Sequence, residues 1–166
     1  MLLKKIHLLL LITTLIVHFS VYSQENKQCP KYTDVLSLIE TQVNKDDETL
    51  KYLNLNTLDC YLDKIAQHAE SYPPKFKTEK EKQYIEKVLH EILGLFLILD
   101  EPKSTDIDFL WRYGRASAIG HNLDFRNADH KAIDCFDRAL TINSNHIETN
   151  YHWVKLQKWG KSELEA

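Results

Sequence analysis

The sequence predicts an all-α fold. Two observations predict it. Apolar residues recur at helical spacing along nearly the whole chain after residue 23, and no segment forms a convincing strand. Only four glycines occur in 166 residues. We therefore expect about six helices in one domain over residues 24–166, which is long enough to bury a substantial core.

The first 23 residues have the features of a secretory signal peptide. Two lysines precede an apolar run over residues 8–17, and small residues follow it. Val21 and Ser23 suit the −3 and −1 positions, which predicts cleavage before Gln24. The alternative is a membrane anchor, but the run is shorter than the roughly 18 apolar residues that such an anchor needs. The mature protein is therefore expected to be secreted or periplasmic, with no integral membrane segment.

The charge of the mature chain argues against nucleic acid as a partner. The full sequence has 21 basic and 24 acidic residues, and removing the two signal-peptide lysines leaves 19 basic residues, a net charge of −5 with histidines neutral. Nucleic acids and anionic membranes are both bound through basic surfaces. Neither is therefore expected as the main partner.

Three cysteines remain in a chain that is expected to enter an oxidising compartment. A bridge between Cys29 and Cys60 would tie the N-terminal arm to the body, and three buried or free thiols are the alternative. Spacing alone does not decide between them. Cys135 lies beside the apolar face of a predicted helix, and no pair of cysteines has the spacing of metal ligands.

The first three predicted helices follow from apolar periodicity and from helix-start signals. The first is expected over Tyr32–Val43 and the second over Asn56–Ser71, after which two consecutive prolines break the chain. Thr78 opens the third, with Glu81 placed to complete a capping box. That helix ends in ILGLFLILDEP, which is apolar nearly all round and stopped by Pro102. We therefore expect it at the centre of the fold.

The last three predicted helices have the clearest patterns. Thr105 and Asp108 form a capping-box pattern before the fourth, DFLWRYGRASAIGHN. Its apolar residues form two stripes on opposite sides, which predicts that it is sandwiched between other helices. The fifth begins near Asn127, and the sixth is expected over His146–Trp159.

The sixth helix has two apolar stripes, one more than its neighbours in the chain would cover. The first stripe is expected to pack on the fifth helix and consists of Ile147, Tyr151 and Val154. The second stripe consists of Trp153, Leu156 and Trp159. Either the N-terminal helix covers this second stripe, or it is an interface for a partner or a second copy. We favour the interface.

The segment KAIDCFDRALTINSN, residues 131–145, places small residues on both sides of a large apolar one. Ala132, Phe136 and Ala139 lie on one helical face, and Gly120 lies on the preceding helix, so that two helices can approach closely. This pattern resembles the tetratricopeptide repeat, a helix–turn–helix unit of about 34 residues.

The resemblance covers one full repeat, about residues 109–145, and a half repeat, 146–160. Upstream, FLWRYGRA is similar to a helix of the regulator-of-microtubule-dynamics branch of this superfamily. Ser144 stands where the family often has proline, and Ala116 where it often has tryptophan. The resemblance implies hairpins that stack into a short right-handed superhelix.

The same resemblance implies that the concave side of the stack binds a protein or peptide. It assigns Ser117 and His121 of the fourth helix, and Tyr151 and Lys155 of the sixth, to that groove. Some family members clamp a C-terminal carboxylate with lysine and asparagine, but this chain has serine and histidine in those places. Carboxylate-tail binding of that kind is therefore not expected.

No recognised catalytic, metal or cofactor motif is present. HEILG at His90 begins like a zinc-protease helix, but Gly94 stands where the second histidine is required. We therefore expect no enzyme and no cofactor. The sequence instead predicts an exported module that binds a protein, a peptide or a second copy of itself through a helical groove and its terminal helix. The alternatives are a structural or assembly subunit of an envelope complex and, third, a hydrolase with an unrecognised site.

Overall fold

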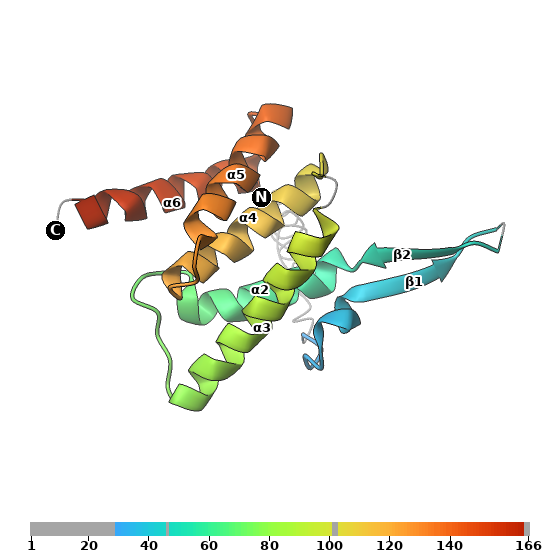
Figure 1. The fold of residues 1–166 in the computed structure, drawn as a ribbon, viewed down its shortest axis with the longest axis horizontal. Coiled ribbons are helices and arrows are strands. Elements are labelled where there is room, and N and C mark those ends of the chain that lie inside the picture. The colour runs from blue at the N-terminus through green and yellow to red at the C-terminus, as the bar shows by residue number, and fades with distance from the viewer. Residues whose placement is uncertain (1–28, 46, 101–102, 165–166) are drawn as a thin grey trace, which may run out of the picture.

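The computed structural model describes residues 29–45, 47–100 and 103–164. This part is mostly helical, as predicted, and the helices follow a short N-terminal sheet (Figure 1). The elements are η1 (Val35–Leu38), β1 (Ile39–Val43), β2 (Thr49–Leu53), α2 (Leu55–Ala69), α3 (Glu79–Leu99), α4 (Ile107–Asn122), α5 (Ala128–Ile142) and α6 (Ile147–Leu164). The predicted signal peptide and Pro102 lie outside the described residues. No helix among the described residues has the length and apolar character needed to cross a membrane.

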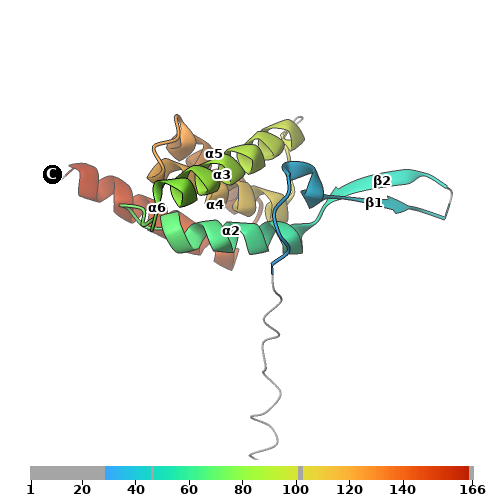
Figure 2. The ribbon, with the colours of Figure 1, turned by 90° about the horizontal axis from the view of Figure 1, so that it is seen from below.

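The N-terminal segment corrects the predicted fold. The predicted helix over Tyr32–Val43 does not form, and a strand is present where none was expected: β1 pairs antiparallel with β2, with Thr41 opposite Lys51. The backbone N–H of Asn44 donates to the carbonyl of Glu48 at 2.9 Å and closes the turn. Three of the five residues of β1 are β-branched, and β2 contains Thr49 and Tyr52; such residues favour extended backbone. The hairpin projects away from the helical body in both views (Figures 1 and 2).

Helix α4 lies at the centre of the helical body. It contacts α2, α3, α5 and α6. Leu110 and Ala118 on one side and Phe109 and Tyr113 on the other are all buried. The predicted sandwich is therefore confirmed.

Helix starts follow local capping chemistry. Thr78 caps α3 as predicted, because its hydroxyl accepts a hydrogen bond from the N–H of Glu81 at 3.1 Å. At α4 the cap is Asp106 and not the predicted Thr105, since the Asp106 carboxylate accepts from the N–H of Asp108 at 2.8 Å.

The α4–α5 hairpin is built on a small–large contact. Ala132, Phe136 and Ala139 are fully buried, as the sequence pattern predicts. The glycine that faces Phe136 is Gly114, however, because a Cβ there would lie 2.4 Å from the Phe136 ring. A Cβ on Gly120, the glycine expected at this contact, would instead meet Leu93 of α3 at 3.3 Å.

Helix α6 packs with the opposite face from the one predicted. Leu156 is buried in a cluster with Ala118 and Phe136, and Trp153 packs against the same cluster. The predicted packing stripe is exposed and consists of Ile147, Tyr151 and Val154. The predictions that this stripe packs on α5 and that Trp153 and Leu156 form an outer interface are therefore wrong. Both faces carry large apolar residues, so only the crossing of α6 over α4 and α5 decides between them. The side chain of Trp159 lies outside the described residues.

The end of α3 is more exposed than its composition predicts. Ile92 and Phe96 are buried, but Leu97 is 56% exposed and Ile98 is 72% exposed. The apolar run therefore begins in the core and ends at the protein surface, and the prediction that all of it lies at the centre is wrong. No described element covers its outer face.

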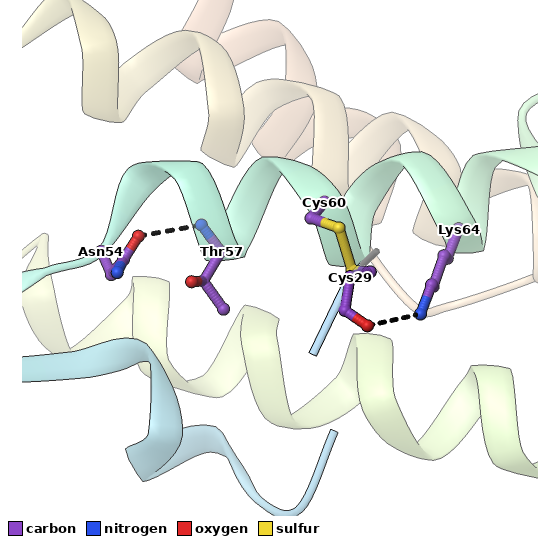
Figure 3. Close-up of a disulfide and its surroundings, with 5 residues drawn as sticks. All are labelled: Cys29, Asn54, Thr57, Cys60 and Lys64. Atoms are coloured by element: carbon purple, nitrogen blue, oxygen red, sulfur yellow. Dashed lines mark hydrogen bonds between the residues drawn. A yellow bond between two sulfur atoms is a disulfide. The ribbon is translucent and has the colours of Figure 1, made fainter. Parts of the chain in front are cut away.

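A disulfide joins the N-terminal arm to α2 (Figure 3). The Sγ atoms of Cys29 and Cys60 are bonded, and the Lys64 ammonium donates to the carbonyl of Cys29 at 3.4 Å. Further along the arm, the Tyr32 hydroxyl donates to the Glu91 carboxylate of α3 at 2.7 Å. The arm is thereby attached to both α2 and α3.

Candidate functional site

An open groove of about 780 Å³ lies between α3 and the start of α5, with α4 as its floor. Leu93 and Leu97 of α3 form one wall, and Phe125 of the α4–α5 turn forms part of the other. Tyr113 of α4 contributes the aromatic part of the floor. The groove is therefore mainly apolar, with polar groups at its α5 end.

Local structure explains why these side chains converge. Leu93 and Leu97 are four residues apart, so they lie on the same face of α3. The N–H of Phe125 donates to the carbonyl of Gly120 at 2.9 Å, which holds the turn against the end of α4. The Phe125 ring then meets the His90 ring edge-on, with centroids 6.1 Å apart.

A partly buried ion pair joins α3 to α5, the two helices beside the groove. The Arg138 guanidinium of α5 donates two hydrogen bonds, at 2.9 and 2.8 Å, to the carboxylate of Asp100 at the end of α3. This hydrogen bonding keeps the pKa of Asp100 below its ordinary value, against the effect of its burial. Because the contact is bidentate, it fixes orientation as well as distance.

Gly94 leaves an open space in the α3 wall. A Cβ built on Gly94 would have no atom within 4 Å, in contrast to Gly114. Glycine within a helix costs about 1 kcal/mol relative to alanine. No contact among the described residues offsets that cost at Gly94, so the space it leaves is available to a molecule in the groove.

Ser117 brings an unsatisfied hydroxyl to the floor of the groove. The residue is 1% exposed, and its Oγ forms no hydrogen bond with any described residue. Buried polar groups normally have a partner, because leaving one unpaired costs about 1–3 kcal/mol. No base among the described residues lies at hydrogen-bond distance from this hydroxyl.

The start of α5 supplies further donors. Asn127, the N-cap residue, has a φ of 59° and its side chain makes no capping hydrogen bond. Within the described part of the chain, the N–H groups of Asp129 and His130 meet no acceptor. Unpaired N–H groups and the helix dipole make such a terminus electropositive.

Charged side chains surround this end of the groove. Arg126, Lys131 and Asp124 all line it. Lys131 lies over the Tyr113 ring at 5.2 Å and 3.8 Å from the Asp134 carboxylate. Arg126 has no ion-pair partner among residues 29–45, 47–100 and 103–164. Burial raises the pKa of the Tyr113 phenol, which stays neutral.

Only one of the four groove residues assigned by resemblance lines this groove. Ser117 does, whereas His121, Tyr151 and Lys155 do not. Lys155 instead pairs with Glu70 of α2 at 3.1 Å and lies 4.8 Å over the ring of Tyr151. The four predicted residues are therefore not brought together in this groove.

Sequence reasoning missed most of the actual lining. In the sequence, Gly94 stands out as the residue in place of the second histidine of the zinc-protease motif, and Leu97 belongs to an apolar run. No sequence pattern marks Phe125, Arg126 or Lys131 for binding. One sequence feature points to this site: Gly94 lies inside a segment with a strong helical pattern. Glycine destabilises a helix relative to alanine, so its presence there calls for an explanation.

The described residues offer little for covalent or metal chemistry. In the part of the chain with assigned positions, no three histidine, cysteine or acidic side chains are grouped closely enough to hold a metal ion. Cys135 is a free thiol, but it is buried, and burial raises its pKa to about 12.

No family model, curated protein or solved structure matches this chain. The chemistry of the groove is therefore the basis for the functional proposal.

Proposed function

We propose that this protein is an exported, non-enzymatic module that binds a protein or peptide in the groove between α3 and α5. The main support for the proposal is that the α3 wall of the groove is apolar and exposed to solvent. Leu97 keeps 56% of its surface exposed beside Leu93 and Phe125. Concave apolar sites with a few polar groups are the usual form of binding sites.

Export is supported by two features of the chain. The first 23 residues have the composition of a signal peptide. The Cys29–Cys60 disulfide fits an oxidising compartment, since such bonds are rare in the cytosol. The secreted or periplasmic location therefore belongs to the same proposal.

A tetratricopeptide-like stack remains our proposal for the architecture. The buried seam of Ala132, Phe136 and Ala139 supports it, since close approach of paired helices is what that repeat requires. The proposed binding surface is not the concave side that the resemblance implies, because it lies between α3 and α5.

Site-specific photocrosslinking in the producing cells tests the binding function. A photoreactive amino acid at Leu97 should capture one defined partner, because this side chain lines the groove. Ile98 is the matched control: it is adjacent, apolar and more exposed at 72%, but it is not part of the groove lining. Equal capture from both positions, or none from Leu97, would contradict the proposal.

An assembly subunit is the second candidate function, and the β-hairpin favours it. The hairpin projects from the body and exposes Val43, Leu50 and Tyr52 to solvent. Two-stranded sheets are only marginally stable alone, and their unpaired edges readily add a further strand. Under this alternative, shortening the hairpin to a tight turn would abolish a stoichiometric complex and leave the melting of the helical body unchanged.

A further inference from the structure

We propose that the groove recognises an acidic peptide segment of its partner. The peptide backbone passes over Gly94, a large apolar side chain lies against Leu93, Leu97 and Phe125, and a carboxylate is held at the α5 end. The inference rests on the proposed peptide-binding function and specifies its ligand.

The space above Gly94 is the first observation. At Gly114 the lack of a side chain is explained by internal packing, because the Phe136 ring fills that place. Gly94 has no such neighbour and lies on the exposed groove wall. A peptide backbone can approach a helix closely only where no side chain intervenes, and Gly94 provides that position.

The unpaired hydroxyl of Ser117 is the second and independent observation. It is buried under the groove without a hydrogen-bond partner among the described residues. Next to the lining residues Asn127 and Ala128, the N–H groups of Asp129 and His130 in the first turn of α5 have no acceptor in the described part, although neither residue lines the groove itself. A carboxylate is an acceptor-only group, so it matches a site that is rich in donors.

Charge favours the same ligand. The whole chain has a net charge of −3, yet the groove lining contains Arg126 and Lys131 against Asp124. Lys131 also contacts Asp134 at 3.8 Å, and ion pairs with this degree of exposure are weak. A ligand carboxylate can therefore compete for the Lys131 ammonium.

A peptide fits the groove better than a fatty acid does. The wall at Leu97 is more than half exposed, at 56%. Sites for small apolar ligands usually bury about 70–90% of the ligand surface, whereas an acyl chain along this wall would stay largely in water. A peptide needs to bury only one side chain here while its backbone remains solvated.

Selection of random linear peptides displayed on phage against the full mature protein tests this inference. We expect the enriched peptides to contain an Asp or Glu close to a Leu, Phe or Trp. Replacing that acidic residue by its amide should weaken binding about tenfold or more, since hydrogen bonds to charged groups are the stronger kind.

Variants at Gly94 locate the site. Gly94→Ala should weaken peptide binding while raising the melting temperature, because alanine favours the helix and occupies the space. Gly94→Leu should abolish binding, and Arg126→Gln should weaken acidic peptides more than their amide versions. Ile98→Ala, beside the groove, should leave binding unchanged.

The outcomes separate this inference from the function on which it rests. If no peptide is enriched, the peptide-binding function fails, and the inference with it. If peptides are enriched but lack acidic residues, or bind equally well to Gly94→Leu, only the acidic-peptide inference is overturned. Displacement of the peptides by a long-chain fatty acid at lower concentration would likewise overturn it in favour of a lipid ligand.

Discussion

Gly114 of α4 faces the ring of Phe136 of α5 so closely that a Cβ on Gly114 would lie 2.4 Å from Cε1 of the ring. The ring is fully buried and occupies the space of the missing side chain. The distance between α4 and α5 therefore depends on a glycine at this position. Because α4 contacts every other α-helix of the described chain, a change here affects the whole body.

Gly114→Ala should destabilise the protein by about 1–3 kcal/mol, the usual cost of overfilling a packed core. Gly94→Ala is the matched control, and it should stabilise by up to about 1 kcal/mol because it adds a helix-favouring residue in open space. Urea unfolding of the two variants measures both free energies. Equal effects of the two substitutions would contradict the packing described here.

Leu156→Ala should destabilise by about 2–5 kcal/mol, since this side chain is buried against Phe136. Val154→Ala, on the exposed face of the same helix, should stay within about 0.5 kcal/mol of the wild type. Thermal and urea melts compare the two. The reverse order would mean that α6 docks through its other face, as the sequence pattern alone predicts.

Thiol titration of the unreduced, denatured protein should find one free thiol, that of Cys135. In the native state this thiol should react slowly, because it is buried and its pKa is raised to about 12. Cys60→Ser should lower stability by about 2–5 kcal/mol through loss of the bond to Cys29. Three thiols in the first measurement would exclude the disulfide.

His152 should make the protein sensitive to mild acid. Burial lowers its pKa from 6.5 to about 4, and the nearby Arg115 and Lys155 act in the same direction. Between these values the unfolded chain binds the proton and the folded chain does not, so stability should fall as the pH drops from about 6.5 to about 4.

Replacing His152 with phenylalanine, which keeps an aromatic ring beside Trp111, should flatten that part of the stability profile. The control is His130→Gln, since the His130 side chain is 80% exposed. Urea unfolding at a series of pH values measures the slope. An unchanged slope in the His152 variant would assign the acid sensitivity to other groups.

The Asp100–Arg138 pair should affect the free energy of unfolding at a lower pH than His152 does. Hydrogen bonds from Arg138 depress the pKa of Asp100, so its contribution to stability is complete above the unfolded value of about 4 and is lost as the pH falls further. Asp100→Asn should remove that loss and should also loosen the groove between α3 and α5. The exposed Asp137, changed to asparagine, is the control for the pH profile. If the stability of Asp100→Asn falls with pH just as that of the wild type does, the loss of stability in acid does not come from the Asp100–Arg138 pair.

Local patterns alone determined much of the helical body. Apolar periodicity predicts α2 to α6, because a helix repeats every 3.6 residues whatever surrounds it. Thr78 predicts the start of α3, since a cap bonds only to its own first turn. The seam of Ala132, Phe136 and Ala139 is also readable, because its residues lie on one helical face.

Tertiary structure decided the features that depend on several elements at once. The segment Ile39–Val43 becomes a strand because β2 is there to pair with it, and isolated patterning is a weak guide to such pairing. Only the crossing of α6 over α4 and α5 selects its Leu156 face over its Tyr151 face, since both are apolar. The groove combines side chains from three helices and a turn, and the importance of Gly94 depends on what surrounds it in space. Empty space beside a helix is a property of its neighbours, and the local sequence does not contain it.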